Sequence, residues 1–338
     1  MLFHLSQSLT SKDILIIYSG WLTFLVFYHT VKHSADLGFV KAIFYALLCV
    51  GVLSTLVGII QYFIDPYFIR VGAEREAFSG RLRANGVFSA EYDNSYFLIP
   101  ATVVALTTVK NKYRYPLIGI YLIGILLTFH RMSWIITILT FAGYYLFCAP
   151  KREKIFAIGG ILILILIVLY IVFLLPTGLN INKDFVYNRL LQDTTSGRFN
   201  MDEMAFHRIQ NAWLLGVGSV RTNTYYADMS KAGMRGFATG EIGGIHNLFL
   251  NMGYFYGLPV VISFCAFLFS GTIYFARKMK QCGSFYFIPT AAVVMFILAN
   301  LSNFFYLNLD VSVLLSIILG TSIAVYQKRL NIHEIIAF

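Results

Sequence analysis

Long apolar segments separated by polar connections dominate the sequence. Nine of them approach the length that crosses a bilayer as a helix, roughly 17–25 residues. They lie near residues 14–31, 42–64, 94–109, 116–129, 133–149, 155–175, 247–274, 285–303 and 311–326. None alternates between apolar and polar positions as the strands of a membrane barrel do. The pattern predicts an all-α, polytopic integral membrane protein with about nine transmembrane helices, forming a single membrane domain over residues 1–338.

Two longer polar segments, 65–93 and 176–246, interrupt the apolar pattern. The second is the longest polar stretch of the chain, and we expect it to form one large loop. The composition agrees with a membrane protein, because 58% of the residues are hydrophobic, only 12% are charged, and the mean hydropathy is +0.71. Such values exclude an ordinary soluble globular domain.

The basic residues orient the predicted helices. The short connections and the C-terminal tail hold Lys32, Lys41, Lys110, Lys112, Arg114, Lys151, Arg152, Lys154, Arg277, Lys278, Lys280, Lys328 and Arg329. By the positive-inside rule this side is cytoplasmic, so loops 65–93 and 176–246 are extracytoplasmic. Nine spans with a cytoplasmic C-terminus place the N-terminus outside. Either the first span is miscounted, or the chain lacks helices that a longer relative has.

The type of cation also differs between the two sides. Lysine dominates the cytoplasmic connections, whereas the predicted outer side carries Arg70, Arg75, Arg81, Arg83, Arg131, Arg189, Arg198, Arg208, Arg221 and Arg235. Arginine is the better residue for planar, bidentate contact with phosphate or carboxylate. This segregation predicts an anion-binding surface outside the membrane. For any single arginine, pairing with an acidic residue of the same loops is an equally good interpretation.

Arg131 is the first candidate residue. It lies in the turn between the apolar runs 116–129 and 133–149, and the first run has only about 14 residues. Such a helix reaches about 21 Å of a hydrocarbon core about 30 Å thick, so Arg131 is expected below the outer surface. An ionisable group at that depth indicates a functional site, although a snorkelling arginine at a helix end is the alternative.

Arg81 and Arg83 are further candidates in the first outer loop. Gly80 and Gly86 flank them and allow a ligand to approach the backbone closely. An ordinary solvated loop explains this segment at least as well.

The large loop holds three more candidates, Arg189, Arg198 and His246. Thr195 or Ser196 can cap a predicted helix and place Arg198 in its first turn, where the helix dipole favours anions. The glycine-rich stretch 216–244 is expected to be a mobile lid or a poorly ordered loop. His246 opens the next apolar run, and an imidazole is a common general base at neutral pH. No Cys/His spacing indicates a metal site.

Four short motifs follow one another in a recognisable order: Arg131 between two hairpin helices, Ser196-Gly197-Arg198, Gly216-Val217-Gly218, and His246-Asn247 ahead of Gly257-Leu258-Pro259. Over roughly residues 79–275 the chain resembles the bacterial O-antigen ligase/polymerase family of membrane glycosyltransferases. The resemblance implies that Arg131 and Arg198 hold a lipid diphosphate and that His246 is essential. The chain departs from the family in reading His130-Arg131 where the hairpin usually has Ser-Arg.

The resemblance implies a polysaccharide polymerase of the bacterial cytoplasmic (inner) membrane, active on its extracytoplasmic face. Its donor is an oligosaccharide linked to undecaprenyl diphosphate, and its acceptor is a sugar hydroxyl of another glycan. A ligase that transfers the glycan to lipid A-core is the alternative. An exporter of anionic or lipid-linked glycans is an alternative of another class. No cofactor, metal or nucleic acid is expected, and a chain-length regulator is a candidate partner.

Overall fold

The computed structural model of the chain describes residues 11–71, 82–150, 153–154, 196–217, 245, 247–301 and 309–336. Side chains are described for these residues except 11–21, 196–201, 309–312, 333 and 336. The predicted span at 155–175, most of the loop 176–246, and the candidate residues Arg81, Arg189 and His246 lie outside this part.

The elements with assigned bounds are all helices, as the apolar pattern predicts. They are α1 (Ser11–Ser34), α2 (Leu37–Phe63), α3 (Glu91–Thr108), α4 (Asn111–Leu127), α5 (Arg131–Phe147), α8 (Ser196–Asn211), α10 (Leu248–Tyr256), α11 (Leu258–Cys282), the 3₁₀ turn η5 (Ser284–Tyr286), α12 (Phe287–Asn300), α13 (Leu309–Gln327) and α14 (Ile332–Ile336). Eight of the nine predicted spans therefore contain described helices.

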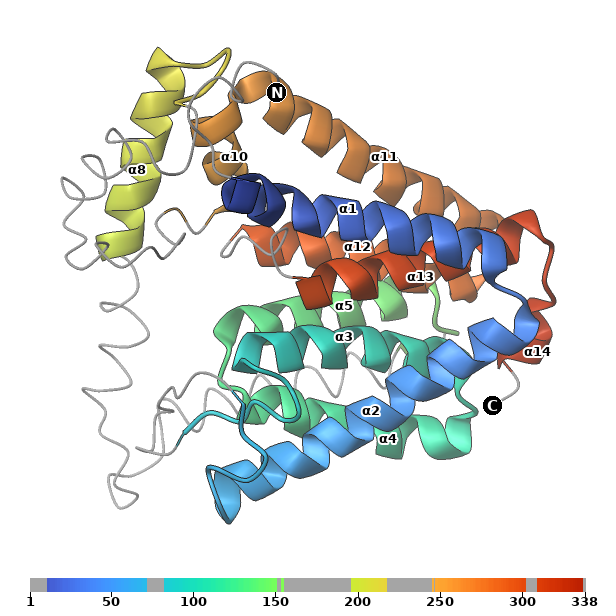
Figure 1. Ribbon diagram of the computed structural model, residues 1–338. Coiled ribbons are helices and arrows are strands. Elements are labelled where there is room, and N and C mark those ends of the chain that lie inside the picture. Colours follow the sequence, from blue (N-terminus) through green and yellow to red (C-terminus); the bar gives the residue numbers. More distant parts are fainter. Residues whose placement is uncertain are drawn as a thin grey trace.

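The connections between the helices gather at two ends of the bundle (Figure 1). One end carries the short connections at 34–37, 108–111 and 282–284, and we call it the short-loop end. The other carries the α2–α3 connection, the α4–α5 turn and helix α8, and we call it the long-loop end. The described lysine-rich connections lie at the first end, and the described parts of the two long polar segments, 65–71, 82–93 and 196–217, lie at the second, as the sequence pattern predicts.

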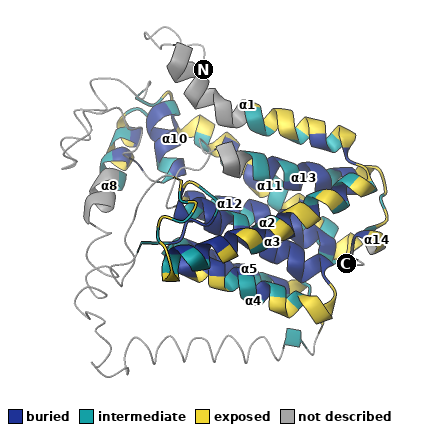
Figure 2. Cartoon of the chain, turned by 60° about the horizontal axis from the view of Figure 1, so that its bottom comes forward, coloured by how far each residue is buried: buried dark blue, intermediate teal, exposed yellow. Residues whose placement is uncertain are grey.

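Helix α3 is the centre of the bundle. It packs against α2, α4, α5, α12 and α13, and Figure 2 shows it buried along most of its length. Its hydroxyls are satisfied within the helix, since Thr102, Thr107 and Thr108 each donate to the carbonyl four residues earlier at 2.7–2.8 Å. This allows polar side chains in an apolar interior.

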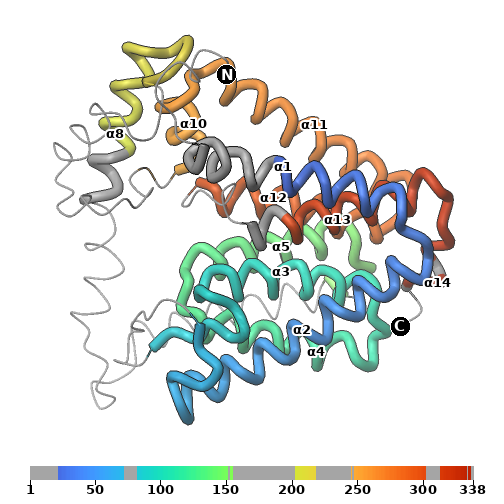
Figure 3. The backbone as a smooth tube through the Cα atoms, in the orientation of Figure 1, coloured from blue at the N-terminus to red at the C-terminus, as the bar shows by residue number. Residues whose placement is uncertain are grey.

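The seventh predicted span, 247–274, is not one continuous helix. The chain breaks at Gly257, whose φ of +83° is unfavourable for any residue with a Cβ. The short helix α10 precedes this break and packs on α8, as Figure 3 shows, and α11 follows it. The prediction of one continuous helix was wrong because the apolar run is unbroken, and only Gly257 and the Pro259 that follows it mark the break.

The helix before Arg131 is longer than the apolar run 116–129 predicts. Helix α4 begins at Asn111, five residues before the apolar run, and at 1.5 Å per residue its 17 residues reach about 26 Å. The apolar run therefore underestimates the length of this helix, and the depth of Arg131 in a membrane stays a prediction. Among the described helices, α2 and α11 are both long and apolar enough to cross a membrane by that measure.

Candidate functional site

A buried glutamine holds the first outer loop against the end of α2. The side-chain oxygen of Gln61 accepts from the backbone N–H groups of Asn85 and Gly86, both at 2.9 Å. Its side-chain nitrogen donates to the carbonyls of Gly86 and Phe68, at 2.9 and 3.1 Å. All four hydrogen-bonding positions of this amide are satisfied, so the loop has a defined position over the bundle.

Gly86 is required at this point of the loop. Its φ is +61°, and a Cβ there would meet the Ser54 hydroxyl and lie 2.9 Å from the side-chain nitrogen of Asn94. Ser54 donates to Asn94 at 2.8 Å and accepts from the N–H of Val87 at 3.1 Å. The glycine thus lets the loop backbone pack directly on α2 and α3, and Arg83 enters the site just before it.

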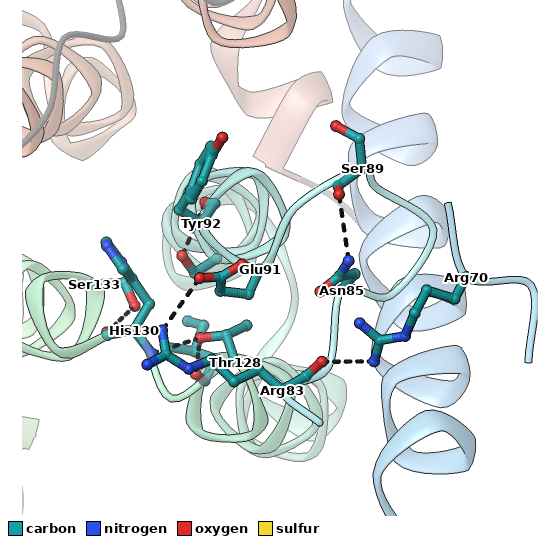
Figure 4. A network of polar contacts seen from close by, with 11 residues as sticks. Arg70, Arg83, Asn85, Ser89, Glu91, Tyr92, Thr128, His130 and Ser133 are labelled. Carbon is teal, nitrogen blue, oxygen red and sulfur yellow. Dashed lines mark hydrogen bonds and ion pairs between the residues drawn. The ribbon is translucent and has the colours of Figure 1, made fainter. Parts of the chain in front are cut away.

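Arg83 forms an ion pair with Glu91, the first residue of α3 (Figure 4). The two groups are 3.2 Å apart, and the Glu91 side chain is fully buried whereas that of Arg83 is 19% exposed. The guanidinium of Arg70 donates to the backbone carbonyl of Arg83 at 2.7 Å. The ion pair lies at the long-loop end, and of its two side chains that of Arg83 is the more exposed to solvent.

The α4–α5 turn brings Arg131 to the same end. Phe129 has a φ of +50°, which reverses the chain, and Arg131 is the first residue of α5. The turn is held by Ser133, whose hydroxyl donates to the carbonyl of His130 at 2.7 Å, and by Trp134, whose ring N–H donates to the carbonyl of Ile125 at 3.2 Å. Arg131 therefore sits where the positive end of the α5 dipole favours an anion.

One backbone hydrogen bond joins the first outer loop to this hairpin. The N–H of Ala84 donates to the carbonyl of Leu127 at the end of α4, at 3.0 Å. Because Ala84 follows Arg83 and Leu127 ends the helix before the turn, the structure brings Arg83 and Arg131 to one end of the bundle. Nothing in the sequence indicated that Arg83 and Arg131 lie at the same end of the bundle.

His130 lies between this hairpin and the start of α3. Its ring packs edge-to-face on Tyr96, with centroids 5.4 Å apart, and lies 6.4 Å from the ring of Tyr92 (Figure 4 shows Tyr92 and His130 near Glu91). The neighbour of Arg131 is thus an aromatic packing residue that fixes the turn.

Arg198 lies in the first turn of α8, as the capping pattern predicted, and its side chain is outside the described part. Helix α8 packs on α10 through Ala205 and the buried Ile245, Tyr254 and Phe255. Asn247 caps α10 by accepting from the N–H groups of Phe249 and Leu250, at 2.9 and 3.2 Å. The residues on both sides of position 246 are therefore anchored to this pair of helices.

The turn after α8 is locked to the α10–α11 junction. The N–H of Val217 donates to the backbone carbonyl of Tyr254 at 2.6 Å, and the N–H of Leu258 donates to the backbone carbonyl of Trp213 at 2.7 Å. A Cβ on Gly216 would lie 2.5 Å from the carbonyl carbon of Phe255. Gly216 is therefore a packing residue of this junction, and the rest of the glycine-rich stretch, 218–244, lies outside the described residues.

Sequence reasoning missed Glu91 and Gln61. A glutamate in the first turn of a helix is ordinary in any protein, so nothing marked Glu91 as the partner of Arg83. Gln61 carries a signal in retrospect, because it is a polar residue near the end of the very apolar helix α2. Within the described residues, no cluster of three His, Cys, Asp or Glu side chains could hold a metal ion.

The arrangement is suited to binding an anion at the long-loop end. Arg83 and Arg131 are brought there by separate elements, and the first turn of α8 adds Arg198. Residues 116–265 match the family model described as O-antigen ligase. The match includes Arg131, Arg189, Arg198 and His246, and it begins after Arg81 and Arg83.

No curated protein matches the sequence. The two long apolar helices agree with the membrane-embedded character of the matched family. The match favours an enzyme over the exporter alternative. Residues 116–265 of the chain are similar to the O-antigen ligase family of membrane glycosyltransferases.

Proposed function

We propose that this protein is a polysaccharide polymerase that transfers a glycan from undecaprenyl diphosphate to a sugar hydroxyl. The observation that carries the proposal is the family match, which spans Arg131, Arg198 and His246 in one segment. The position of Arg131 at the start of α5 supports an anion site there, because the helix dipole and the guanidinium attract the same negative charge.

The two arginines Arg131 and Arg198 bind the diphosphate of the donor, with Arg81, Arg83 and Arg189 contributing to the same basic surface. Breaking the bond between the anomeric carbon and the diphosphate oxygen leaves negative charge on the polyprenyl diphosphate. Arginines held in place before the reaction stabilise that charge, which is usually the largest single contribution to catalysis. Because guanidinium groups neutralise the leaving group, the reaction requires no metal.

His246 acts as the general base. Its imidazole removes the proton from the acceptor hydroxyl, whose oxygen attacks the anomeric carbon as the diphosphate leaves from the opposite side. This single displacement inverts the anomeric centre. Support comes from the anchoring of Ile245 and Asn247, since a base acts efficiently only when its backbone is fixed.

The spacing of α8 fits this assignment. Ala205 packs in the same cluster as Ile245, and Arg198 precedes Ala205 by seven residues, or about 10 Å along the helix axis. That distance suits a diphosphate and a sugar ring lying between an arginine and a base. We place the long-loop end on the extracytoplasmic face of the bacterial inner membrane, because lysines dominate the short-loop end.

A ligase differs only in its acceptor, which would be a lipid A-core sugar, and the description of the matched family favours keeping it as the second candidate. The polymerase and ligase assignments are distinguished by the glycan that a deletion strain makes with and without the wild-type gene. A polymerase deletion reduces a ladder of chain lengths to single repeats. A ligase deletion leaves long chains on the polyprenyl carrier.

The same strain tests the catalytic assignment with His246→Ala and a matched control, His207→Ala. His207 is an exposed histidine on α8, so its substitution should restore the glycan fully. Loss of the glycan with His246→Ala alone, at equal protein abundance, supports the proposal. Full restoration by His246→Ala would remove the base from the mechanism.

A further inference from the structure

An apolar groove lies between α1 and α11, away from the long-loop end. Its walls come from Phe24 on α1 and Phe264 and Leu268 on α11, and its floor comes from Phe296 on α12 and Leu319 on α13. The cavity has a volume of about 530 Å³, within the range of about 300–1,000 Å³ that is typical of small-molecule sites. Figure 3 shows the four helices as neighbours in the bundle.

The groove opens toward the surface that a bilayer would cover. Leu25 and Phe267 border it and are 49% and 54% exposed, whereas Phe264, Leu268 and Phe296 are buried below them. A large exposed apolar surface of this kind is stable only against another apolar phase. A hydrocarbon chain that enters from the side matches the apolar character of this opening.

The length of the groove matches one leaflet. The α11 residues that line it run from Phe264 to Phe275, which is eleven positions and about 16 Å along the axis. The hydrocarbon core of a whole bilayer is about 30 Å thick. Toward the long-loop end Phe264 packs on Phe249 of α10 and on Phe296, with centroids 6.3 and 6.4 Å apart, so aromatic rings lie at that end of the groove.

Cations surround the other end of the groove. Helix α11 ends in Arg277, Lys278 and Lys280, α1 in Lys32 and His33, and α13 is followed by Lys328 and Arg329. Tyr274 lines the groove, and one turn later the ammonium of Lys278 lies 4.0 Å from the centre of the Tyr326 ring and donates to its hydroxyl at 2.7 Å. Lys278 is thus held beside the end of the groove.

The described carboxylates at the short-loop end are already engaged. Asp36 accepts from the N–H of Phe39 as the cap of α2, Glu334 lies 3.8 Å from Lys41, and Glu153 lies 3.8 Å from Arg114. Among the described side chains, none of these acids is paired with Lys278. The end of the groove therefore has a net positive charge beside an apolar channel.

We propose that this groove binds an acyl chain of an anionic phospholipid of the short-loop leaflet, with the phosphate of its head group on Lys278. An apolar channel one leaflet long with cations at its end complements that ligand in both shape and charge. The polyprenyl chain of a donor is too long for a groove of this length. The diphosphate of a donor held at the long-loop end would also lie far from these cations. The site would be a regulatory or structural lipid site distinct from the glycan site.

Gly271 provides the variant that tests the groove. It lines the cavity, and a Cβ added there would have no neighbour within 4 Å, so Gly271→Leu adds its side chain to the space of the channel. Gly119→Leu is the matched control, because Gly119 is also a helix glycine with open space around its Cβ and lies outside the groove. Lys278→Gln removes the charge and leaves the apolar walls unchanged.

The experiment is native mass spectrometry of the full chain in detergent with equal amounts of phosphatidylglycerol and phosphatidylcholine. Wild type and Gly119→Leu should retain phosphatidylglycerol preferentially, and Gly271→Leu should lose most of the bound lipid of both kinds. Lys278→Gln should lower the preference about fivefold, the effect expected of one cation at a membrane surface.

Lipid retention by Gly271→Leu equal to wild type would overturn the site, as would an unchanged preference in Lys278→Gln. Displacement of phosphatidylglycerol by added undecaprenyl phosphate would also overturn it, since the groove would then belong to the donor. Lys278 is only partly buried, so its variant gives an answer even if Gly271→Leu does not fold.

Discussion

At the scale of single residues, the long-loop end is organised by charge. Glu91 is fully buried, and Arg83 lies 3.2 Å from its carboxylate. Removing one partner of such a pair leaves a desolvated charge and costs more than the pair itself contributes. An exposed pair such as Lys41 and Glu334, 3.8 Å apart, is worth far less.

This difference predicts the effect of two alanine substitutions on stability. Glu91→Ala should lower the free energy of unfolding by about 1–3 kcal/mol, the cost of leaving a charged hydrogen-bonding group without its partner. Glu334→Ala should change it by less than about 1 kcal/mol. Thermal unfolding in detergent measures both, and equal melting temperatures for the two variants would contradict the role of Glu91.

Arg131→Lys tests the need for a guanidinium. A lysine keeps the charge but cannot make two parallel hydrogen bonds to a phosphate, so transfer should fall at least about tenfold. The control is Arg114→Lys at the short-loop end, where Arg114 pairs with Glu153, and its activity should stay near that of wild type. Rates are compared at equal protein abundance, and a similar loss in both variants would mean that the effect of Arg131 is not specific.

The residue scale is also where prediction from the sequence had the least success. Arg131 was singled out by the short apolar run before it and Arg83 by the glycines beside it, and both belong to the arginines of the outer segments. Their joining through Ala84 and Leu127, and the pairing of Arg83 with Glu91, depend on contacts between separate elements. Such contacts leave no local pattern in one sequence.

At the scale of elements, the apolar pattern predicts helices well because every helix in a bilayer must satisfy its backbone internally. It predicts their ends poorly. Helix α4 extends through the polar residues from Asn111, and the apolar run at 247–274 conceals the break at Gly257. Both differences arise from backbone geometry rather than from hydrophobicity.

The break between α10 and α11 lets the turn after α8 pack against it, and this packing can be tested at Gly216 and Gly257. A methyl group at either position would collide with the backbone of the opposing segment, so each alanine variant should separate α8 from the α10–α11 junction. Because that junction anchors Ile245 and Asn247, transfer activity should be lost while the bundle remains folded. Gly119→Ala, whose Cβ meets open space, should keep full activity.

Activity and the melting temperature are measured together for the three glycine variants. Full transfer by Gly216→Ala would show that the junction does not support the site. A melting temperature that collapses with activity would instead mean that α8 is part of the folding core.

At the scale of the whole molecule, the two ends of the bundle differ in their chemistry. The short-loop end carries lysines in tight connections, and the long-loop end carries arginines and the polar segments (Figure 1). The sequence predicted this polarity correctly, because the charge rule depends on composition and loop length alone.

The orientation in the membrane is tested by cysteine labelling in a variant without the four native cysteines. Ser89 and Asn331 are exposed at opposite ends. A membrane-impermeant maleimide should label Ser89→Cys in intact spheroplasts and Asn331→Cys only after permeabilisation. The reverse result would place the arginine-rich end in the cytoplasm.

The most direct test of the central claim is transfer by the purified chain in proteoliposomes that contain an undecaprenyl-diphosphate-linked repeat. Wild type should extend the repeat into a ladder, at a rate unchanged by a metal chelator, because arginines neutralise the leaving diphosphate. His246→Ala should leave the donor unextended. A ladder of equal length from His246→Ala, or a wild-type reaction abolished by the chelator, would contradict the mechanism.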